Sequence, residues 1–169
     1  MTTFHHSGKP REAPSARLVG LDAIFRLTGL ATQGKFALVE HPIAPGTLVP
    51  PHTHSREDEY SYVLEGEVGM KIGDQEFLAT AGDIIIKPRG ISHTFWNSGP
   101  RLARLLEIIA PAGFESYFEE MARVLNVAGP PDQEQIGRIA EQYGLTYQME
   151  QIPDLATKYH LHDPTAAGN

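Results

Sequence analysis

Short β-prone runs, cut at close intervals by Gly, Pro or Asp, fill the middle of this 169-residue sequence from about residue 17 to residue 110. The runs are Lys35 to Pro42, Tyr60 to Leu64, Glu67 to Ile72, Glu76 to Ala79, Asp83 to Lys87, His93 to Trp96 and Leu102 to Ile109. Such even spacing favours an antiparallel sandwich or barrel. The segment IGDQEF further predicts a tight hairpin with Gly73-Asp74 at its tip, which pairs the strand carrying Met70 with the one carrying Phe77.

After Pro111 the apolar period changes to that of a helix. One stripe consists of Phe114, Tyr117, Phe118, Met121 and Leu125. A second helix is expected from an N-cap at Asp132, with Gln135 three residues later, to a C-terminal Gly144. We therefore divide the chain into a flexible arm (1–16), a β-barrel (17–112), a helical extension (113–150) that packs on the outside of the barrel, and a tail (151–169).

Composition excludes several classes of function. A formal net charge of −7, without a Lys/Arg stripe, makes nucleic acid an unexpected partner. The absence of Cys excludes a disulfide framework, a thiolate metal site and a Cys nucleophile. There is no apolar run of about 18 residues and no apolar secretory segment near the N-terminus, so we expect a cytoplasmic protein with no membrane partner.

Three histidines and one glutamate form a candidate metal site. His52 and His54 stand at i and i+2, so on a strand both imidazoles point to one face. A short turn could return Glu59 beside them, and His93 begins a later strand after a Pro/Gly turn. Three imidazoles and one carboxylate suit one divalent transition metal such as Fe, Mn, Ni, Co or Zn, whereas Ca and Mg prefer shells of oxygen alone.

The two segments that carry these residues resemble the two signature motifs of the cupin superfamily. The matched positions are Gly46, His52, His54, Glu59 and Gly66 in the first, and Gly82, Pro88, Gly90, His93 and Asn97 in the second. The resemblance covers roughly residues 35 to 110. It implies an all-β double-stranded β-helix, or jelly-roll, barrel, followed here by a pair of C-terminal α-helices, with a metal held inside by His52, His54, Glu59 and His93.

The alternation of side chains along a strand also predicts which residues line a pocket. Val63 shares a side with Glu59, and Phe95 and Asn97 share the interior face with His93. Phe95 suits either a pocket wall or barrel filling, and Met70 suits either pocket wall or core. Trp96 has the opposite parity and is expected to pack beneath the C-terminal helices.

The remaining titratable residues are assigned no role at the site. His41 stands outside the pattern, and His5, His6, His160 and His162 lie in the predicted arm and tail. The run from Arg56 to Asp58 is interpreted as a solvated turn with only Glu59 directed inward. Lys87 and Arg89 are expected on the outer rim of the barrel.

Longer segments, among them EDEYSYVLEG and KPRGISHTFWN, resemble small single-domain bacterial cupins that are compared with quercetin 2,3-dioxygenases. This second resemblance implies cleavage by O2 of a flavonol-like or other enolic aromatic substrate, with Glu59 as both ligand and base. A metal-dependent isomerase, decarboxylase or lyase acting on a small oxygenated acid or sugar is the alternative, and a small-molecule binding module without turnover is a third. The sequence also allows a homodimer.

Overall fold

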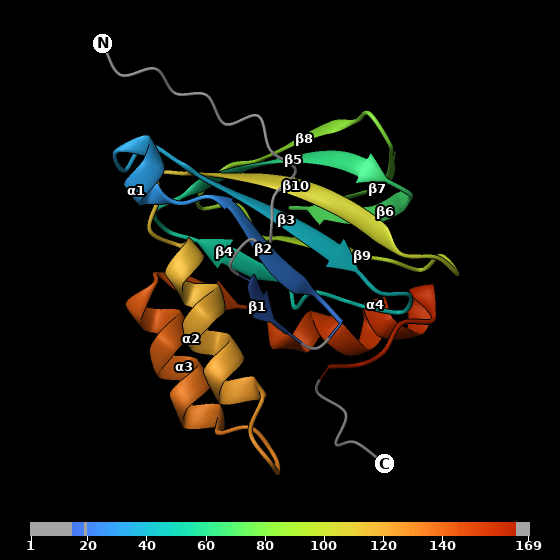
Figure 1. Ribbon diagram of the computed structural model, residues 1–169. Helices are drawn as coiled ribbons and strands as arrows, with labels where there is room; N and C mark the ends of the chain where they lie inside the picture. Colours follow the sequence, from blue (N-terminus) through green and yellow to red (C-terminus); the bar gives the residue numbers. More distant parts are fainter. Residues whose placement is uncertain (1–14, 19, 165–169) are drawn as a thin grey trace.

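The computed structural model describes residues 15–18 and 20–164, and its strands form two antiparallel sheets that face each other (Figure 1). The six-stranded sheet has the order β1 (Ser15–Arg17), β2 (Asp22–Leu27), β3 (Ala37–Ile43), β10 (Ala103–Ala110), β5 (Asp58–Glu65) and β8 (Ile84–Lys87). The five-stranded sheet has the order β11 (Leu145–Tyr147), β4 (His52–His54), β9 (His93–Trp96), β6 (Glu67–Ile72) and β7 (Gln75–Thr80). The predicted all-β jelly roll is confirmed.

Alternation along the strands decides which residues enter the barrel. In β10, Ala103, Leu105, Glu107 and Ile109 are all buried, while the residues between them are more exposed. Because side chains alternate across a strand, one polar residue, Glu107, is drawn into an otherwise apolar row. In the neighbouring β3, His41 is likewise buried on the inward face, between Val39 and Ile43. The barrel interior is therefore partly polar.

The predicted hairpin joins β6 and β7. Met70 pairs with Phe77, and Ile72 pairs with Gln75, which leaves Gly73-Asp74 as a two-residue turn. Gly73 has a φ of 54°, a left-handed conformation that glycine adopts without steric cost. The hairpin and its register agree with the sequence prediction.

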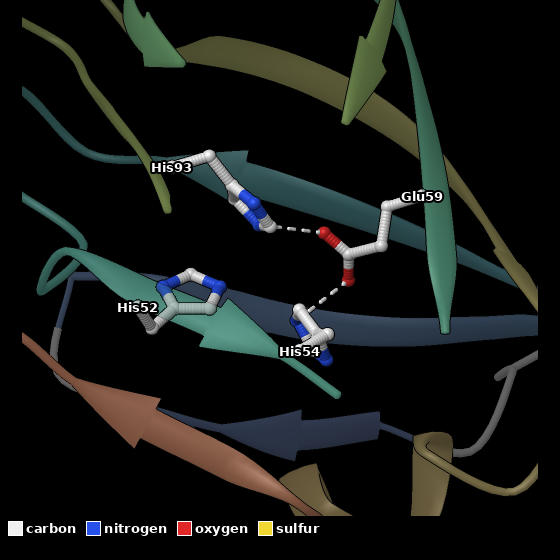
Figure 2. Close-up of side chains that lie close together, drawn as sticks. All are labelled: His52, His54, Glu59 and His93. Atoms are coloured by element: carbon white, nitrogen blue, oxygen red, sulfur yellow. Dashed lines mark hydrogen bonds and ion pairs between the residues drawn. The ribbon is translucent and has the colours of Figure 1, made fainter. Parts of the chain in front are cut away.

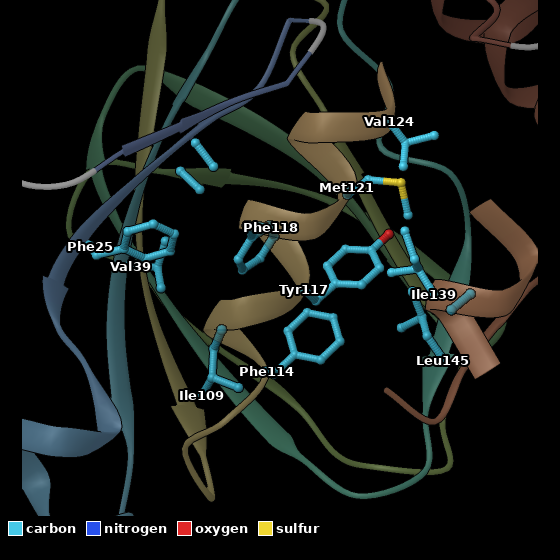
Figure 3. Packing of buried hydrophobic residues seen from close by; sticks show 13 residues of the cluster. Phe25, Val39, Ile109, Phe114, Tyr117, Phe118, Met121, Val124, Ile139 and Leu145 are labelled. Carbon is cyan, nitrogen blue, oxygen red and sulfur yellow. The ribbon is translucent and has the colours of Figure 1, made fainter. Parts of the chain in front are cut away.

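Helices close one end of the barrel. After α1 (Gly29–Thr32), the helices α2 (Glu115–Leu125) and α3 (Gln133–Gln142) lie together below the sheets in Figure 1. The Asp132 side chain caps α3 by accepting hydrogen bonds from the backbone of Glu134 and Gln135, as predicted. Figure 3 shows Phe118 of α2 packed toward Phe25 and Val39 of the barrel. The α2 stripe thus faces the barrel interior, whereas the sequence suggested packing on the outside.

The C-terminal segment contains a further helix that the sequence did not indicate. A 3-10 turn, η1 (Met149–Gln151), leads into α4 (Ile152–Tyr159), whose Ile152 and Leu155 are buried against Trp96. Trp96 also stacks on Tyr159, with ring centroids 4.4 Å apart. Trp96 therefore packs beneath a C-terminal helix, as expected, although that helix is α4. Of the predicted arm, residues 1–14 lie outside the described residues, and Ser15 and Ala16 belong to β1.

Candidate metal centre

Four buried side chains meet inside the barrel. His52 and His54 come from β4, Glu59 from β5 and His93 from β9, so both sheets contribute (Figure 2). Their ligand atoms all lie within 4.8 Å of one another. His54 Nε2 is 3.3 Å from Glu59 Oε1, and His93 Nε2 is 3.1 Å from Glu59 Oε2. The arrangement is one carboxylate surrounded by three imidazoles.

Outer hydrogen bonds orient two of the three imidazoles. His52 Nδ1 is 2.7 Å from the carbonyl oxygen of Pro50, and His93 Nδ1 is 3.2 Å from that of Ile91. A carbonyl only accepts hydrogen bonds, so in the neutral ring Nδ1 carries the proton and Nε2 keeps its lone pair. His54 Nδ1 instead lies 3.4 Å from Glu57 Oε2. Burial, together with the neighbouring His93 and His54, lowers the pKa of His52 well below its ordinary value, which favours the neutral form that binds metals.

A buried lysine borders the cluster. Lys87 Nζ lies 2.8 Å from Glu59 Oε2 and 2.6 Å from Glu107 Oε2, and its side chain is fully buried. Glu107 also accepts a hydrogen bond from the Ser61 hydroxyl. Burial alone would raise the pKa of Glu59, but the charge of Lys87 and the adjacent His54 and His93 outweigh burial and hold it well below its ordinary value. Glu59 is therefore ionised, as a ligand must be.

The cluster fits a divalent metal ion. His54 Nε2 is buried and makes no hydrogen bond within residues 15–18 and 20–164, although it faces the Glu59 carboxylate. A buried polar atom without a partner is costly, and a bound cation would satisfy it. Ligand atoms about 2.1 Å from a shared ion lie within about 4.2 Å of one another, so the observed spacing is close to that of a coordination shell. The donor set of three nitrogens and one carboxylate suits transition metals better than Ca or Mg.

A cavity of about 330 Å³ opens onto the cluster and has mostly apolar walls. His52, His54 and Glu59 are among its polar wall residues. The apolar wall includes Phe95 of the barrel, Phe114 at the N-cap of α2, and Tyr117, Phe118 and Met121 of α2. The rings of Phe114 and His54 are 4.4 Å apart, so the start of α2 reaches the candidate metal ligands. The helical extension is therefore part of the site.

The residues predicted for a pocket lie in different places. Phe95 lines the cavity. Val63 and Met70 do not line it; they belong to the apolar cluster of the barrel that also contains Phe95. The Asn97 amide donates hydrogen bonds to the carbonyl oxygens of Ile43 and Arg101. The Asn97 side chain thus links the residue after β9 to the backbone at Ile43 and Arg101.

Three polar residues near the cluster were not anticipated. Lys87 was expected on the outer rim but is fully buried, because it follows the inward Ile85 by two residues. Glu57 was expected in a solvated turn but is buried beside His54. His41 was assigned no role but lines the cavity. Strand alternation was the available signal for His41, which stands two residues after the apolar Val39 and two before Ile43. Asp58 pairs with the exposed Arg89, as a surface residue does.

Comparison with known proteins agrees with this geometry. The model of the cupin domain family matches residues 40–109. A germin-like protein 5-1 of Oryza sativa subsp. japonica is 33% identical over 135 residues, which cover 75% of this chain and 58% of that protein. The chain spans about half the length of such curated relatives.

Solved structures support the same assignment. A structure from Thermotoga maritima, described as a predicted oxalate decarboxylase, is 26% identical and superposes with a TM-score of 0.52 over 54% of this chain and 80% of that one. An RmlC-like cupin from Shewanella frigidimarina is 21% identical, with a TM-score of 0.56 over 69% and 99% of the two chains. The barrel is thus a double-stranded β-helix with a buried His/Glu cluster. Residues 40–109 match the cupin domain family, and the fold is the one that these cupin structures share. Within the described part of the chain, no helix is long and apolar enough to span a membrane.

Proposed function

We propose that this protein is a metal-dependent dioxygenase that acts on a flavonol-like or other enolic aromatic substrate. The observation that carries the proposal is the cavity: its walls are mostly aromatic and aliphatic, and three residues of the candidate metal centre line it. Flat apolar ligands gain affinity from such walls, while a few polar groups fix their orientation. A substrate that enters with its enolic oxygen foremost would reach His52, His54 and Glu59.

The charges of the wall favour a substrate of low charge. Among the described residues that line the cavity, none is a lysine or an arginine. The nearby cation, Lys87, is already paired with Glu59 and Glu107. A small dianionic acid or a sugar phosphate requires cationic partners when it leaves water. An apolar enol has no such requirement.

The chain's own residues have distinct parts in this proposal. When bound, a divalent transition metal supplies Lewis acidity that stabilises an enolate oxygen. Glu59 accepts the proton of the enolic hydroxyl, and Lys87 holds the Glu59 carboxylate in place. Phe95, Phe114 and Phe118 confine the ring and exclude water. Both atoms of O2 enter the products, so the reaction requires no external reductant.

A second candidate is a metal-dependent decarboxylase, isomerase or lyase acting on a small oxygenated acid or sugar. The structural similarity to the Thermotoga maritima protein described as a predicted oxalate decarboxylase favours it. It would consume no O2. The two candidates therefore differ in a simple measurement.

The test is oxygen uptake by protein loaded separately with Fe, Mn, Co, Ni or Zn, using a panel of flavonols and related enols. Parallel samples with oxalate and other small acids are assayed for CO2 release. Metal-dependent O2 consumption with an enol supports the dioxygenase. A filled metal site that consumes no O2 with any enol but releases CO2 from an acid would select the second candidate instead.

Glu59→Gln tests the proposed base. The amide keeps an oxygen that can bind the metal but has lost the ability to accept a proton, so turnover should fall at least 100-fold while metal content falls much less. Asp58→Asn is the matched control, since Asp58 is paired with Arg89 at the surface, and it should change neither quantity. Equal loss of metal and turnover in Glu59→Gln would leave Glu59 a ligand only.

A further inference from the structure

His41 is a buried polar residue of the cavity that does not belong to the candidate metal centre. It extends inward from β3, is 1% exposed and lines the same cavity as His52, His54 and Glu59. Its ring is 5.1 Å from the Phe118 ring, which it meets edge on, and 6.5 Å from the Phe95 ring. It does not belong to the cluster of candidate ligands. The His41 imidazole is thus a polar group among the aromatic residues of the cavity wall.

Hydrogen bonding fixes the tautomer of His41. Nδ1 lies 2.9 Å from the carbonyl oxygen of Asp22, which can only accept, so Nδ1 carries the proton. Burial lowers the pKa of His41, although the charge of Glu107 opposes this effect, and the ring is neutral at pH 7. Nε2 is then an acceptor with a free lone pair.

Nε2 is open to the cavity. Throughout residues 15–18 and 20–164 no group donates a hydrogen bond to it. It is also absent from the buried side-chain atoms that are sealed off without a partner, which are His54 Nδ1, His54 Nε2 and Glu57 Oε2. An unpartnered atom that is not sealed off, on a residue that lines a cavity, faces that cavity.

The other buried polar groups of the wall are already engaged. Both oxygens of Glu107 accept hydrogen bonds, from Ser61 and Lys87. The Thr47 hydroxyl donates to the carbonyl oxygen of Gly20. The Tyr117 and Tyr147 hydroxyls are hydrogen-bonded to each other. Among the described residues that line the cavity away from the candidate metal ligands, His41 is therefore the buried one whose acceptor atom takes part in no hydrogen bond.

We propose that His41 determines substrate specificity: its Nε2 accepts a hydrogen bond from a second hydroxyl group on an aromatic substrate whose enolic oxygen lies at the metal centre. This inference rests on the proposed function, because it takes the cavity as the binding site of an enolic substrate. It narrows the substrate class to polyhydroxylated aromatic enols. A site built to pair with a hydroxyl discriminates against the analogue that lacks it.

The test measures binding rather than turnover. Protein loaded with Zn²⁺, which has no redox chemistry, is titrated with quercetin, which has several hydroxyl groups, and with 3-hydroxyflavone, whose single hydroxyl is the enolic one. Binding is followed by the absorption of the flavonol. Wild type should bind quercetin about tenfold more tightly than 3-hydroxyflavone.

Two variants separate hydrogen bonding from packing. His41→Leu should weaken quercetin binding about tenfold and leave 3-hydroxyflavone binding unchanged. His41→Gln, whose amide oxygen can stand near the position of Nε2, should recover part of the preference. A circular dichroism spectrum and a Zn²⁺ content equal to those of wild type show that each variant is folded.

The outcomes distinguish this inference from the proposed function. If wild type binds both flavonols alike, or if His41→Leu weakens both equally, His41 is a packing residue and the inference is wrong while the proposed function stands. Discrimination through His41 without O2 uptake would uphold the inference and refute the dioxygenase. Failure of wild type to bind either flavonol would overturn the inference, while O2 uptake with the wider panel of enols would still decide the proposed function.

Discussion

Lys87→Met is the substitution that tests the interior of this barrel most severely. The Lys87 side chain is fully buried, and its Nζ contacts the carboxylates of Glu59 and Glu107 at 2.8 and 2.6 Å. Burial alone would lower the pKa of Lys87, but the charges of Glu107 and Glu59 outweigh it and raise the pKa, so the ion pairs are formed at pH 7. Methionine fills a similar volume but leaves two buried carboxylates without their cation.

The expected cost follows from that loss. Removing one partner of a buried ion pair typically lowers the free energy of unfolding by about 3 to 5 kcal/mol. For a chain of this size about 1 kcal/mol corresponds to about 2 to 4 °C, so the melting temperature should fall by about 6 to 20 °C. Urea and thermal unfolding of the metal-free protein measure both quantities without a contribution from metal binding.

Two controls keep this experiment interpretable. Lys35→Met removes an exposed lysine and should change stability by less than about 0.5 kcal/mol. The double variant Lys87→Met/Glu107→Gln removes one of the stranded carboxylates, so it should recover part of the lost stability. A Lys87→Met protein that unfolds like wild type would refute the buried ion pairs.

Further predictions concern packing and pH. A Cβ on Gly69 would stand 2.1 Å from the Trp96 ring, so Gly69→Ala should lower the free energy of unfolding by about 1 to 3 kcal/mol. Gly137 lies in α3 with open space around it, so Gly137→Ala should raise the free energy of unfolding, measured in urea, by up to about 1 kcal/mol. A destabilised Gly137→Ala would contradict the helix. Arg104 and Arg26 outweigh burial and lower the pKa of Glu40 below 4.5. The folded state then binds fewer protons, so this contribution to stability is present above pH 4.5 and is lost as the pH falls through the lowered pKa. Glu40→Gln should therefore flatten the loss of unfolding free energy in acid; an unchanged acid slope would count against the ion pairs.

The metal cluster could be predicted because its evidence is local. The spacing of His52 and His54 fixes a shared face, and the motif around His93 supplies the third imidazole in a strand whose bounds the sequence also indicates. The runs of β-prone residues likewise predicted most of the strands, because most of these runs end within two residues of a Gly or a Pro. Candidate ligands whose direction follows from their position along one strand could thus be predicted from the sequence.

Other parts of the site depend on packing that no local pattern specifies. In β8 three isoleucines precede Lys87, so both faces are apolar and the sequence does not say which turns inward; Ile85 does, while Ile84 and Ile86 are exposed. The apolar stripe of α2 was predicted, but its docking over the barrel interior arises from contacts far apart in sequence. α4 is only eight residues long, too short for a strong periodic signal.

The central claim is that His52, His54, Glu59 and His93 hold one divalent metal ion. Elemental analysis of the purified protein measures it directly, alongside His52→Ala and, as a control from the same cavity, His41→Leu. We expect about one transition-metal ion per chain in wild type and in His41→Leu, and far less in a folded His52→Ala protein. Metal content in His52→Ala equal to that of wild type would contradict the assignment.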